Sequence, residues 1–116
     1  VGFDENLLTF MINNCRFNST AYVPYIPATG TLRLDSDKVV YTKDKYMRLQ
    51  TPMVFPFYQF YGCYNKAKDK GIEYQTASDL YEDNSGLVNY VMGNRLNFKV
   101  TFAEDIDVVR LLYNHE

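Results

Sequence analysis

The segment LNFKVTF, residues 96–102, decides the fold that the sequence predicts. Apolar and polar side chains alternate along its whole length, so that residues 96, 98, 100 and 102 share one face. Strict alternation puts successive side chains on opposite faces, which is the pattern of a half-buried β-strand. We therefore expect a strand here, with its apolar face turned toward a core.

The residues just before this segment predict its partner strand. Residues 87–92 have the composition of a strand, and Gly93-Asn94 has the form of a two-residue turn. Two strand patterns joined by a turn that begins with glycine are typical of a β-hairpin. We expect residues 87–102 to form one.

Further upstream, short strand patterns separated by polar turns predict a meander. The expected strands cover residues 31–34, 38–42 and 46–50, followed by an aromatic strand over 57–64. Prolines restrict residues 22–26 to an extended edge or loop. The remaining segments are interpreted as a basic loop over 65–71 and an acidic loop or single helical turn over 77–86.

After residue 102 the apolar period changes from two to about 3.6, which indicates an amphipathic helix over residues 103–114. Its apolar face holds Ala103, Ile106, Val109, Leu112 and Tyr113. Acidic residues occupy its first turn, where the helix dipole favours anions. We expect this helix to dock on the sheet or on a partner.

These patterns predict a mainly β protein: a small open or closed β-barrel of the oligonucleotide-binding type with one C-terminal α-helix. The 116 residues fit a single domain, residues 1–116. Residues 1–14 would be an N-terminal arm or first strand, 15–102 the barrel and 103–114 the helix. No run approaches the ~20 apolar residues of a membrane-spanning helix, and the N-terminus does not have the pattern of a signal peptide.

The residue types give little support for catalysis or metal binding. His115 is the only histidine and lies next to the end of the chain, where a rigid triad is not expected. Cys15 and Cys63 could form one disulfide, but two free thiols in a reducing compartment are favoured. Their separation does not match metal-ligand spacing, and no glycine-rich phosphate loop is present. We expect no enzyme activity, no catalytic residue, no metal and no cofactor.

Basic residues interleaved with aromatic ones point instead to single-stranded RNA. Residues 33–70 hold eight basic and four acidic residues, whereas the rest of the chain is acidic. Cations neutralise phosphates and flat rings stack on bases, although the same charges could be ordinary surface charge and the tyrosines could be core. The candidate RNA-binding residues are Arg33, Lys38, Tyr41, Lys43, Lys45, Tyr46, Arg48, Tyr64, Lys66, Lys68 and Lys70. With so little net positive charge, binding should be weak and salt-dependent.

The two ends of the chain carry a family resemblance. Val1 at the start and Tyr113-Asn114-His115-Glu116 at the end resemble the cleavage pattern of the main protease of okaviruses, which are invertebrate nidoviruses. The order of elements, with a terminal amphipathic helix, resembles the non-structural protein nine family of nidovirus replicase subunits. The resemblance implies a polyprotein cleavage product in the replication complex of the host cytoplasm.

The resemblance also implies partners. They are single-stranded RNA, the viral polymerase complex, which would modify the free amine of Val1, and a second copy bound through the terminal helix. The candidate docking residues of this helix are Ile106, Val109, Leu112 and Tyr113. Residues 103–116 contain no glycine, so the Gly-x-x-x-Gly contact of that family is not available. The alternative function is a viral structural or protein-interaction module that does not bind nucleic acid.

Overall fold

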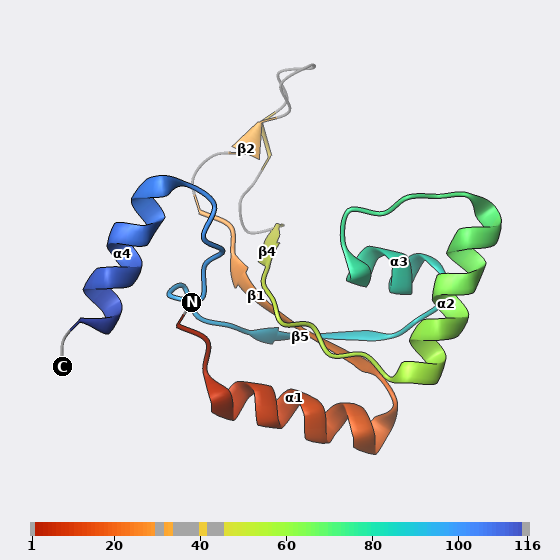
Figure 1. Ribbon diagram of the computed structural model, residues 1–116. Helices are drawn as coiled ribbons and strands as arrows, with labels where there is room; N and C mark the ends of the chain where they lie inside the picture. Colours follow the sequence, from red (N-terminus) through yellow and green to blue (C-terminus); the bar gives the residue numbers. More distant parts are fainter. Residues whose placement is uncertain (1, 30–31, 34–39, 42–45, 115–116) are drawn as a thin grey trace.

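The structure is a computed structural model that describes residues 2–29, 32–33, 40–41 and 46–114. Within these residues the chain forms a three-stranded sheet, a separate strand pair and four helices (Figure 1). The elements follow in the order α1 (Glu5–Asn18), β1 (Ala21–Pro27), β2 (Leu32–Arg33), β3 (Val40–Tyr41), β4 (Met47–Leu49), α2 (Phe57–Lys70), α3 (Ala77–Asp83), β5 (Val88–Met92) and α4 (Ala103–Tyr113).

Strand β1 is the centre of the sheet, whose order is β4-β1-β5. It runs parallel to β5, with Ala21 opposite Val88, and antiparallel to β4, with Tyr25 opposite Leu49. Residues 21–24 are all buried. Parallel strands are usually covered on both faces, and β1 follows that rule because helices lie against both of its sides.

Two small apolar clusters hold the helices to β1. On one side Met11 and Cys15 of α1 pack with Tyr22. On the other, Cys63 of α2 and Tyr81 of α3 pack with Ala21. Adjacent residues of a strand point to opposite faces, so Ala21 and Tyr22 belong to different clusters. Burial also raises the pKa of the Cys15 thiol and, as the largest cause, that of Tyr81.

The helix ends carry recognisable local signals. Asp4 caps α1 by accepting a hydrogen bond of 2.9 Å from the backbone N of Asn6, and Thr76 caps α3 by accepting one from Asp79. Helix α2 ends at Gly71, whose φ of 68° lies in the left-handed region. Glycine reaches that region without a steric penalty, so it ends helices readily.

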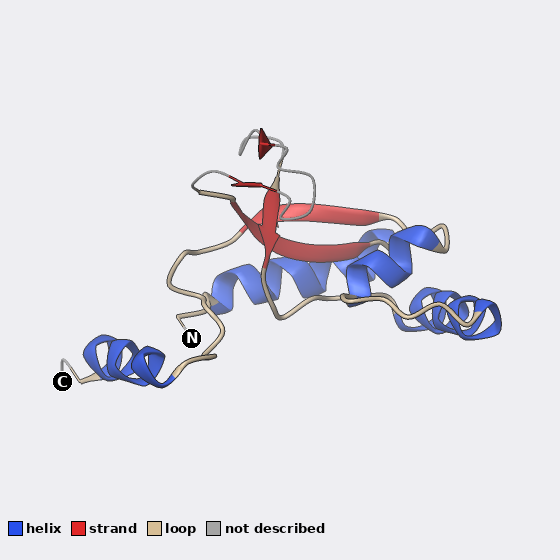
Figure 2. Cartoon of the chain, turned by 90° about the horizontal axis from the view of Figure 1, so that it is seen from above, coloured by secondary structure: helices blue, strands red, loops and turns tan. Residues whose placement is uncertain are grey.

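Helix α4 stands apart from the rest of the molecule. Figures 1 and 2 both show it beyond the end of the sheet opposite α2 and α3. The hydroxyl of Tyr113 near its end accepts a 3.2 Å hydrogen bond from the backbone N of Gly2. None of its residues is buried.

The predicted mainly β barrel is wrong. The sheet is open, with β4 and β5 as its edges, and the described part of the chain holds more helix than strand. The N-terminal arm or first strand over 1–14 is also wrong, because residues 5–18 form α1. Residues 22–26, predicted as an edge or loop, lie in the central strand.

The aromatic strand predicted over 57–64 and the basic loop over 65–71 together form helix α2. Aromatic residues favour strands, but that preference is weaker than the packing of an apolar face. Phe60, Cys63 and Ala67 have the helical spacing i, i+3, i+7 and turn inward. Pro56 just before the helix and Gly71 just after it are its boundary signals.

Residues 96–102 are not a strand, and the hairpin over 87–102 is wrong. The strand predicted over 87–92 is present as β5, but the chain then leaves the sheet. The burial does not follow the expected alternation: Leu96 and Val100 are 50% and 44% exposed, whereas Asn97 is 9% exposed. Hydrogen bonds to Asn97, described below, outweigh the apolar alternation.

Other sequence predictions agree better with the structure. The helix predicted over 103–114 is present as α4, residues 77–86 contain the short helix α3, and both cysteines are free. The meander is confirmed only in part, because β4 pairs with β1 and not with β3. No helix formed by the described residues is long and apolar enough to cross a membrane.

Candidate functional site

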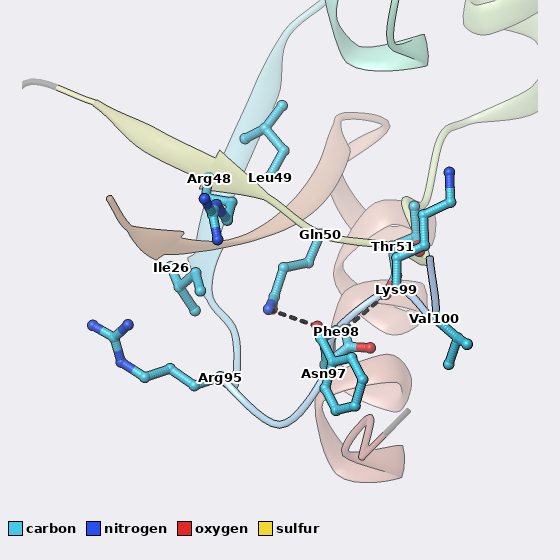
Figure 3. Close-up of a pocket in the computed structure, with 10 residues that line it drawn as sticks. All are labelled: Ile26, Arg48, Leu49, Gln50, Thr51, Arg95, Asn97, Phe98, Lys99 and Val100. Atoms are coloured by element: carbon cyan, nitrogen blue, oxygen red, sulfur yellow. Dashed lines mark hydrogen bonds between the residues drawn. The ribbon is translucent and has the colours of Figure 1, made fainter. Parts of the chain in front are cut away.

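A pocket of about 560 Å³ opens where β4 ends and the segment after β5 passes it (Figure 3). Small-molecule sites typically have volumes of ~300–1,000 Å³. Its walls come from β1, from the end of β4 with the residues after it, and from the segment leading to α4. The lining residues are Ile26, Arg48, Leu49, Gln50, Thr51, Arg95, Asn97, Phe98, Lys99 and Val100.

Gln50 holds the two walls of this pocket together. It is 8% exposed, and its Nε2 donates hydrogen bonds of 2.8 Å and 2.9 Å to the carbonyl oxygens of Asn94 and Asn97. Its Oε1 accepts a 3.2 Å bond from the backbone N of Asn94. Its own backbone N donates to Pro24 of β1. One side chain thus ties residues 94–97 to the sheet.

Asn97 forms the reciprocal link. Its Nδ2 donates a 2.8 Å hydrogen bond to the carbonyl oxygen of Thr51, directly after Gln50. The loop is also tight on its own, since Asn97 N donates to Asn94 O and Leu96 N donates to Asn94 Oδ1. Buried amide groups must find partners, and here they find them in each other's backbone. The segment before Lys99 therefore has a defined path.

The walls held in this way carry three cations. Arg48 comes from β4, while Arg95 and Lys99 come from the segment tied down by Gln50. Figure 3 shows the two arginines at one side of the pocket and Lys99 at the other. Among the described residues that line the pocket, none is Asp or Glu, and no ion pair between described residues involves these three. The pocket is suited to an anion with several oxygen atoms.

Two other concave regions are less suitable for an anion. A cavity of about 340 Å³ between α2 and α3 has one cationic lining residue, Lys66. Beside it, Lys70 Nζ already donates to Asn84 Oδ1 at 3.1 Å. The third region is acidic and is lined by Tyr74, Asp79, Glu82 and Asp83.

The acidic region is internally bonded. Tyr74 donates to Asp83, and Tyr90 of β5 donates to Glu82. Burial, with the hydrogen bond to Glu82 as the next cause, raises the pKa of Tyr90 to about 12. The Tyr90 contact links β5 to α3, and the Tyr74 contact links the segment before α3 to that helix. We assign both a structural role. Nowhere in the described ranges do three or more His, Cys, Asp or Glu side chains come close enough to hold a metal ion.

The residues predicted to bind RNA are scattered in the structure. Arg48 lines the pocket, and Tyr46, 38% exposed, lies just before β4. Tyr64, Lys66, Lys68 and Lys70 all belong to α2. Arg33 lies in β2 and Tyr41 in β3. Lys38, Lys43 and Lys45 lie outside the described residues, as does Val1.

The other pocket residues were not predicted as a site. Arg95 and Lys99 stand in the segment predicted as a hairpin, where Lys99 was assigned to a solvent face, and Gln50 and Asn97 were not singled out. The signal that could have found them is the pair of polar residues at buried positions, and burial is visible only in the fold. The predicted docking residues Ile106, Val109, Leu112 and Tyr113 do share helix α4.

Comparisons with known proteins identify the chain's relatives. The family model of IspD, 2-C-methyl-D-erythritol 4-phosphate cytidylyltransferase, matches residues 4–113. The bifunctional enzyme IspD/IspF of Wolbachia pipientis wMel is 30% identical over 112 residues, covering 94% of this chain and 26% of that protein. The chain thus spans about a quarter of the length of this curated relative.

Solved structures give the same answer for the fold. The 2-C-methyl-D-erythritol 4-phosphate cytidylyltransferase of Thermus thermophilus superposes with a TM-score of 0.84 at 23% identity, covering 96% of this chain and 56% of that one. The 4-diphosphocytidyl-2C-methyl-D-erythritol synthase of Anaerococcus prevotii gives 0.81 at 26% identity, covering 98% and 52%. The fold is a Rossmann-like α/β nucleotidyltransferase fold, seen here as an open sheet with helices.

These matches overturn the viral interpretation. The resemblance to a nidovirus replicase subunit is wrong, and so are RNA and a viral polymerase as partners and the host replication complex as location, because the curated relatives are bacterial. The expectation of a non-enzymatic protein and the alternative of a viral structural or interaction module are wrong too, because the matched family is one of cytidylyltransferases. Terminal residues are a short signal, whereas the family match extends over residues 4–113. Because the match covers nearly the whole chain, this chain belongs to the IspD family.

Proposed function

We propose that this chain is the phosphate-binding part of a cytidylyltransferase that acts on a sugar-alcohol phosphate. The observation that carries the proposal is the pocket that Arg48 and Arg95 line from one side and Lys99 from the other, without an acidic neighbour among the described lining residues. The substrate class comes from the family description, 2-C-methyl-D-erythritol 4-phosphate. Because the chain spans 56% of the Thermus thermophilus relative, we assign it only the binding of this phosphate substrate.

The reaction joins two anions. The product named for the Anaerococcus prevotii relative is 4-diphosphocytidyl-2C-methyl-D-erythritol. To form it, an oxygen of the 4-phosphate bonds to the phosphorus of a cytidylyl group, and the bond from that phosphorus to its leaving group breaks. Like charges repel at short range, so catalysis depends on positioned cations. A pocket lined by three cationic side chains is suited to hold the attacking phosphate.

The three cations would contribute differently. A guanidinium matches two phosphate oxygens with paired N–H donors, whereas an ammonium is a compact point charge. Arg48 is placed by a sheet strand and Lys99 by the segment that Gln50 and Asn97 tie down. Positioned donors on a rigid scaffold need little reorganisation when charge moves, and that is what electrostatic catalysis requires.

Calorimetric titration of the chain with 2-C-methyl-D-erythritol 4-phosphate tests the proposal. We expect binding that weakens with salt, because ions screen partly exposed charges. Lys99→Gln should weaken it on the order of tenfold or more, since a hydrogen bond to a charged group contributes about 1.5–3 kcal/mol. Lys68→Gln, an exposed lysine of α2, is the matched control and should bind as the unchanged chain does.

The unphosphorylated polyol 2-C-methyl-D-erythritol is the matched ligand control and should not bind. Equal affinity of the Lys99→Gln and Lys68→Gln variants would contradict the proposed pocket. Failure of the folded, unchanged chain to bind the phosphate at millimolar concentration would also contradict it.

A further inference from the structure

One buried isoleucine, Ile26, lies in the wall of the pocket and outside both apolar clusters. It is 9% exposed and belongs to β1, the central strand. The buried members of the clusters are Met11, Cys15 and Tyr22 on one side of β1 and Ala21, Cys63 and Tyr81 on the other. Ile26 lines the candidate pocket instead. The central strand thus presents a fixed apolar group to an otherwise cationic site.

The register of the sheet places Ile26 beside Arg48. The two residues are paired directly across β1 and β4. Directly opposed residues of an antiparallel pair point to the same face, with Cβ atoms about 5 Å apart. Leu49 also lines the pocket, but neighbouring residues of a strand point to opposite faces. Figure 3 accordingly shows the Leu49 side chain directed away from the other lining side chains.

The other apolar residues of the pocket lie on its far side. Figure 3 shows Phe98 and Val100 together with Lys99, whereas Ile26 is on the side of the two arginines. Among the described lining residues, Ile26 is therefore the one apolar side chain that accompanies the guanidinium groups. A ligand bound there meets a cation and a hydrocarbon surface at the same time.

The substrate named for the family combines the same two features. It has a phosphate on carbon 4 and a methyl branch on carbon 2, with a single carbon between them. The methyl branch is apolar, and most of the remaining groups are hydroxyls. A phosphate held by an arginine therefore keeps the methyl branch within a few ångströms of the residues beside that arginine.

We propose that Ile26 recognises the methyl branch of the substrate while Arg48 binds its 4-phosphate. This inference rests on the proposed function and adds to it a residue that determines specificity. Isoleucine is β-branched and stiff at χ1, so that little conformational freedom is lost when a ligand packs against it. Burial of one methyl group contributes to affinity by about a factor of four, and an unbranched polyol phosphate would lack that contribution.

Two ligands that differ only in the methyl group test the inference. The chain is titrated in a calorimeter with 2-C-methyl-D-erythritol 4-phosphate and with the unbranched D-erythritol 4-phosphate. We expect the branched phosphate to bind about fourfold more tightly or better. Ile26→Ala should reduce this preference to less than about twofold, mainly by weakening binding of the branched ligand. Ile26→Val keeps the β-branch and should retain most of the preference.

The ratio of the two affinities is the decisive quantity. A merely structural role of Ile26 would weaken both phosphates equally and leave the ratio unchanged. Ile72→Ala is the matched control, because Ile72 is 45% exposed and is not a lining residue of this pocket. Its ratio should equal that of the unchanged chain. Circular dichroism of each variant establishes that it is folded.

Nuclear magnetic resonance gives a direct readout in the unchanged chain. The sequence contains four isoleucines, so that selective labelling of the δ1-methyl groups gives four signals: Ile12, Ile26, Ile72 and Ile106. We expect a nuclear Overhauser effect between the methyl branch of the bound ligand and the δ1-methyl of Ile26 alone. An effect at another isoleucine and none at Ile26 would overturn the inference.

The remaining outcomes separate this inference from the proposed function. Equal binding of both phosphates by the unchanged chain would overturn the role of Ile26 and leave the phosphate site in place. A preference that persists in folded Ile26→Ala would also overturn it, because the methyl contact would then lie elsewhere. If neither phosphate binds, the proposed function itself fails, and the inference fails with it.

Discussion

Residues 93–100 and helix α4 follow one another in the chain, yet they are held in opposite ways. The first segment has no regular secondary structure, but its buried amides bond to Gln50 and Thr51 across the pocket. Helix α4 has regular hydrogen bonds along its own axis and no buried side chain. The irregular segment is thus the better anchored of the two.

The difference shows which parts of the chain are positioned by contacts within the chain itself. The path of residues 93–100 is specified by contacts inside the chain, so the cations of the pocket should be placed even in isolation. The position of α4 is specified by little within the described residues beyond the contact of Tyr113 with Gly2. Substitutions in the two regions should therefore differ strongly in their effect on stability.

Gln50→Leu should have the largest effect. Leucine keeps the volume but leaves the carbonyls of Asn94 and Asn97 without their side-chain donor. Buried groups that lose a partner cost about 1–3 kcal/mol each, so we expect the free energy of unfolding to fall by about 2–4 kcal/mol. Urea denaturation followed by circular dichroism measures it.

Gln75→Leu is the matched control, because Gln75 is exposed between α2 and α3. Its unfolding free energy should stay within about 0.5 kcal/mol of that of the unchanged chain. If Gln50→Leu were equally mild, the segment would not depend on this side chain, and the contrast with α4 would be lost.

Gly93→Ala should have the next largest effect, through the same side chain. A Cβ at residue 93 would lie 2.1 Å from Oε1 of Gln50 and 3.3 Å from the carbonyl oxygen of Tyr25. Displacing a side chain held by three hydrogen bonds should cost about 1–3 kcal/mol. In a Gln50→Ala background the main clash is absent, so the same substitution should cost much less. Equal costs in both backgrounds, measured as a double-mutant cycle, would argue against this clash.

Two elements of the chain's second half were predicted correctly. The strand at β5 was found from its composition, and the helix at α4 from its apolar period of about 3.6. Helix α2 was missed because its exposed aromatics, such as Tyr58 and Tyr61, imitate a strand. Its inward face of Phe60, Cys63 and Ala67 has helical spacing and could have been recognised.

The candidate site was harder to predict for a physical reason. Its cations Arg48 and Lys99 are far apart in the chain and line one pocket only because β1 pairs with both β4 and β5. The alternation in residues 96–102 was misleading, since the burial of Asn97 depends on Gln50, a residue distant in sequence. Contacts between distant polar groups leave no periodic signal in either segment.

Acidification should have a smaller effect, confined to the start of α4. Asp105 accepts hydrogen bonds of 2.9 Å from the backbone N of Phe102 and of Thr101, and these lower the pKa of its carboxyl group. A lowered pKa means that the stabilisation is present above the ordinary value near 3.8 and is lost as the pH falls through the folded-state value. Protection against amide exchange in residues 103–107, taken relative to the intrinsic exchange rate at each pH, should therefore fall below about pH 4.

Asp105→Asn should remove most of that acid dependence, whereas Asp107→Asn, further from the helix start, should keep it. If acid changed this exchange equally in the unchanged chain and in both variants, another group would control the start of the helix. The core amides of β1 serve as the internal reference, because the effect belongs to one helix end and not to global unfolding.

Leu111→Gln should have the smallest effect in the isolated chain and is the strictest test of the contrast. The side chain is 68% exposed, so its replacement should change the free energy of unfolding by no more than about 0.5 kcal/mol. Met11→Ala, at a position with 0% exposure, should by comparison cost about 2–5 kcal/mol in the same denaturation experiment. A loss of more than about 1 kcal/mol for Leu111→Gln would mean that α4 is already packed in the isolated chain. In that case its apolar side chains would be part of this chain's own core, and α4 would not differ from residues 93–100 in how it is held.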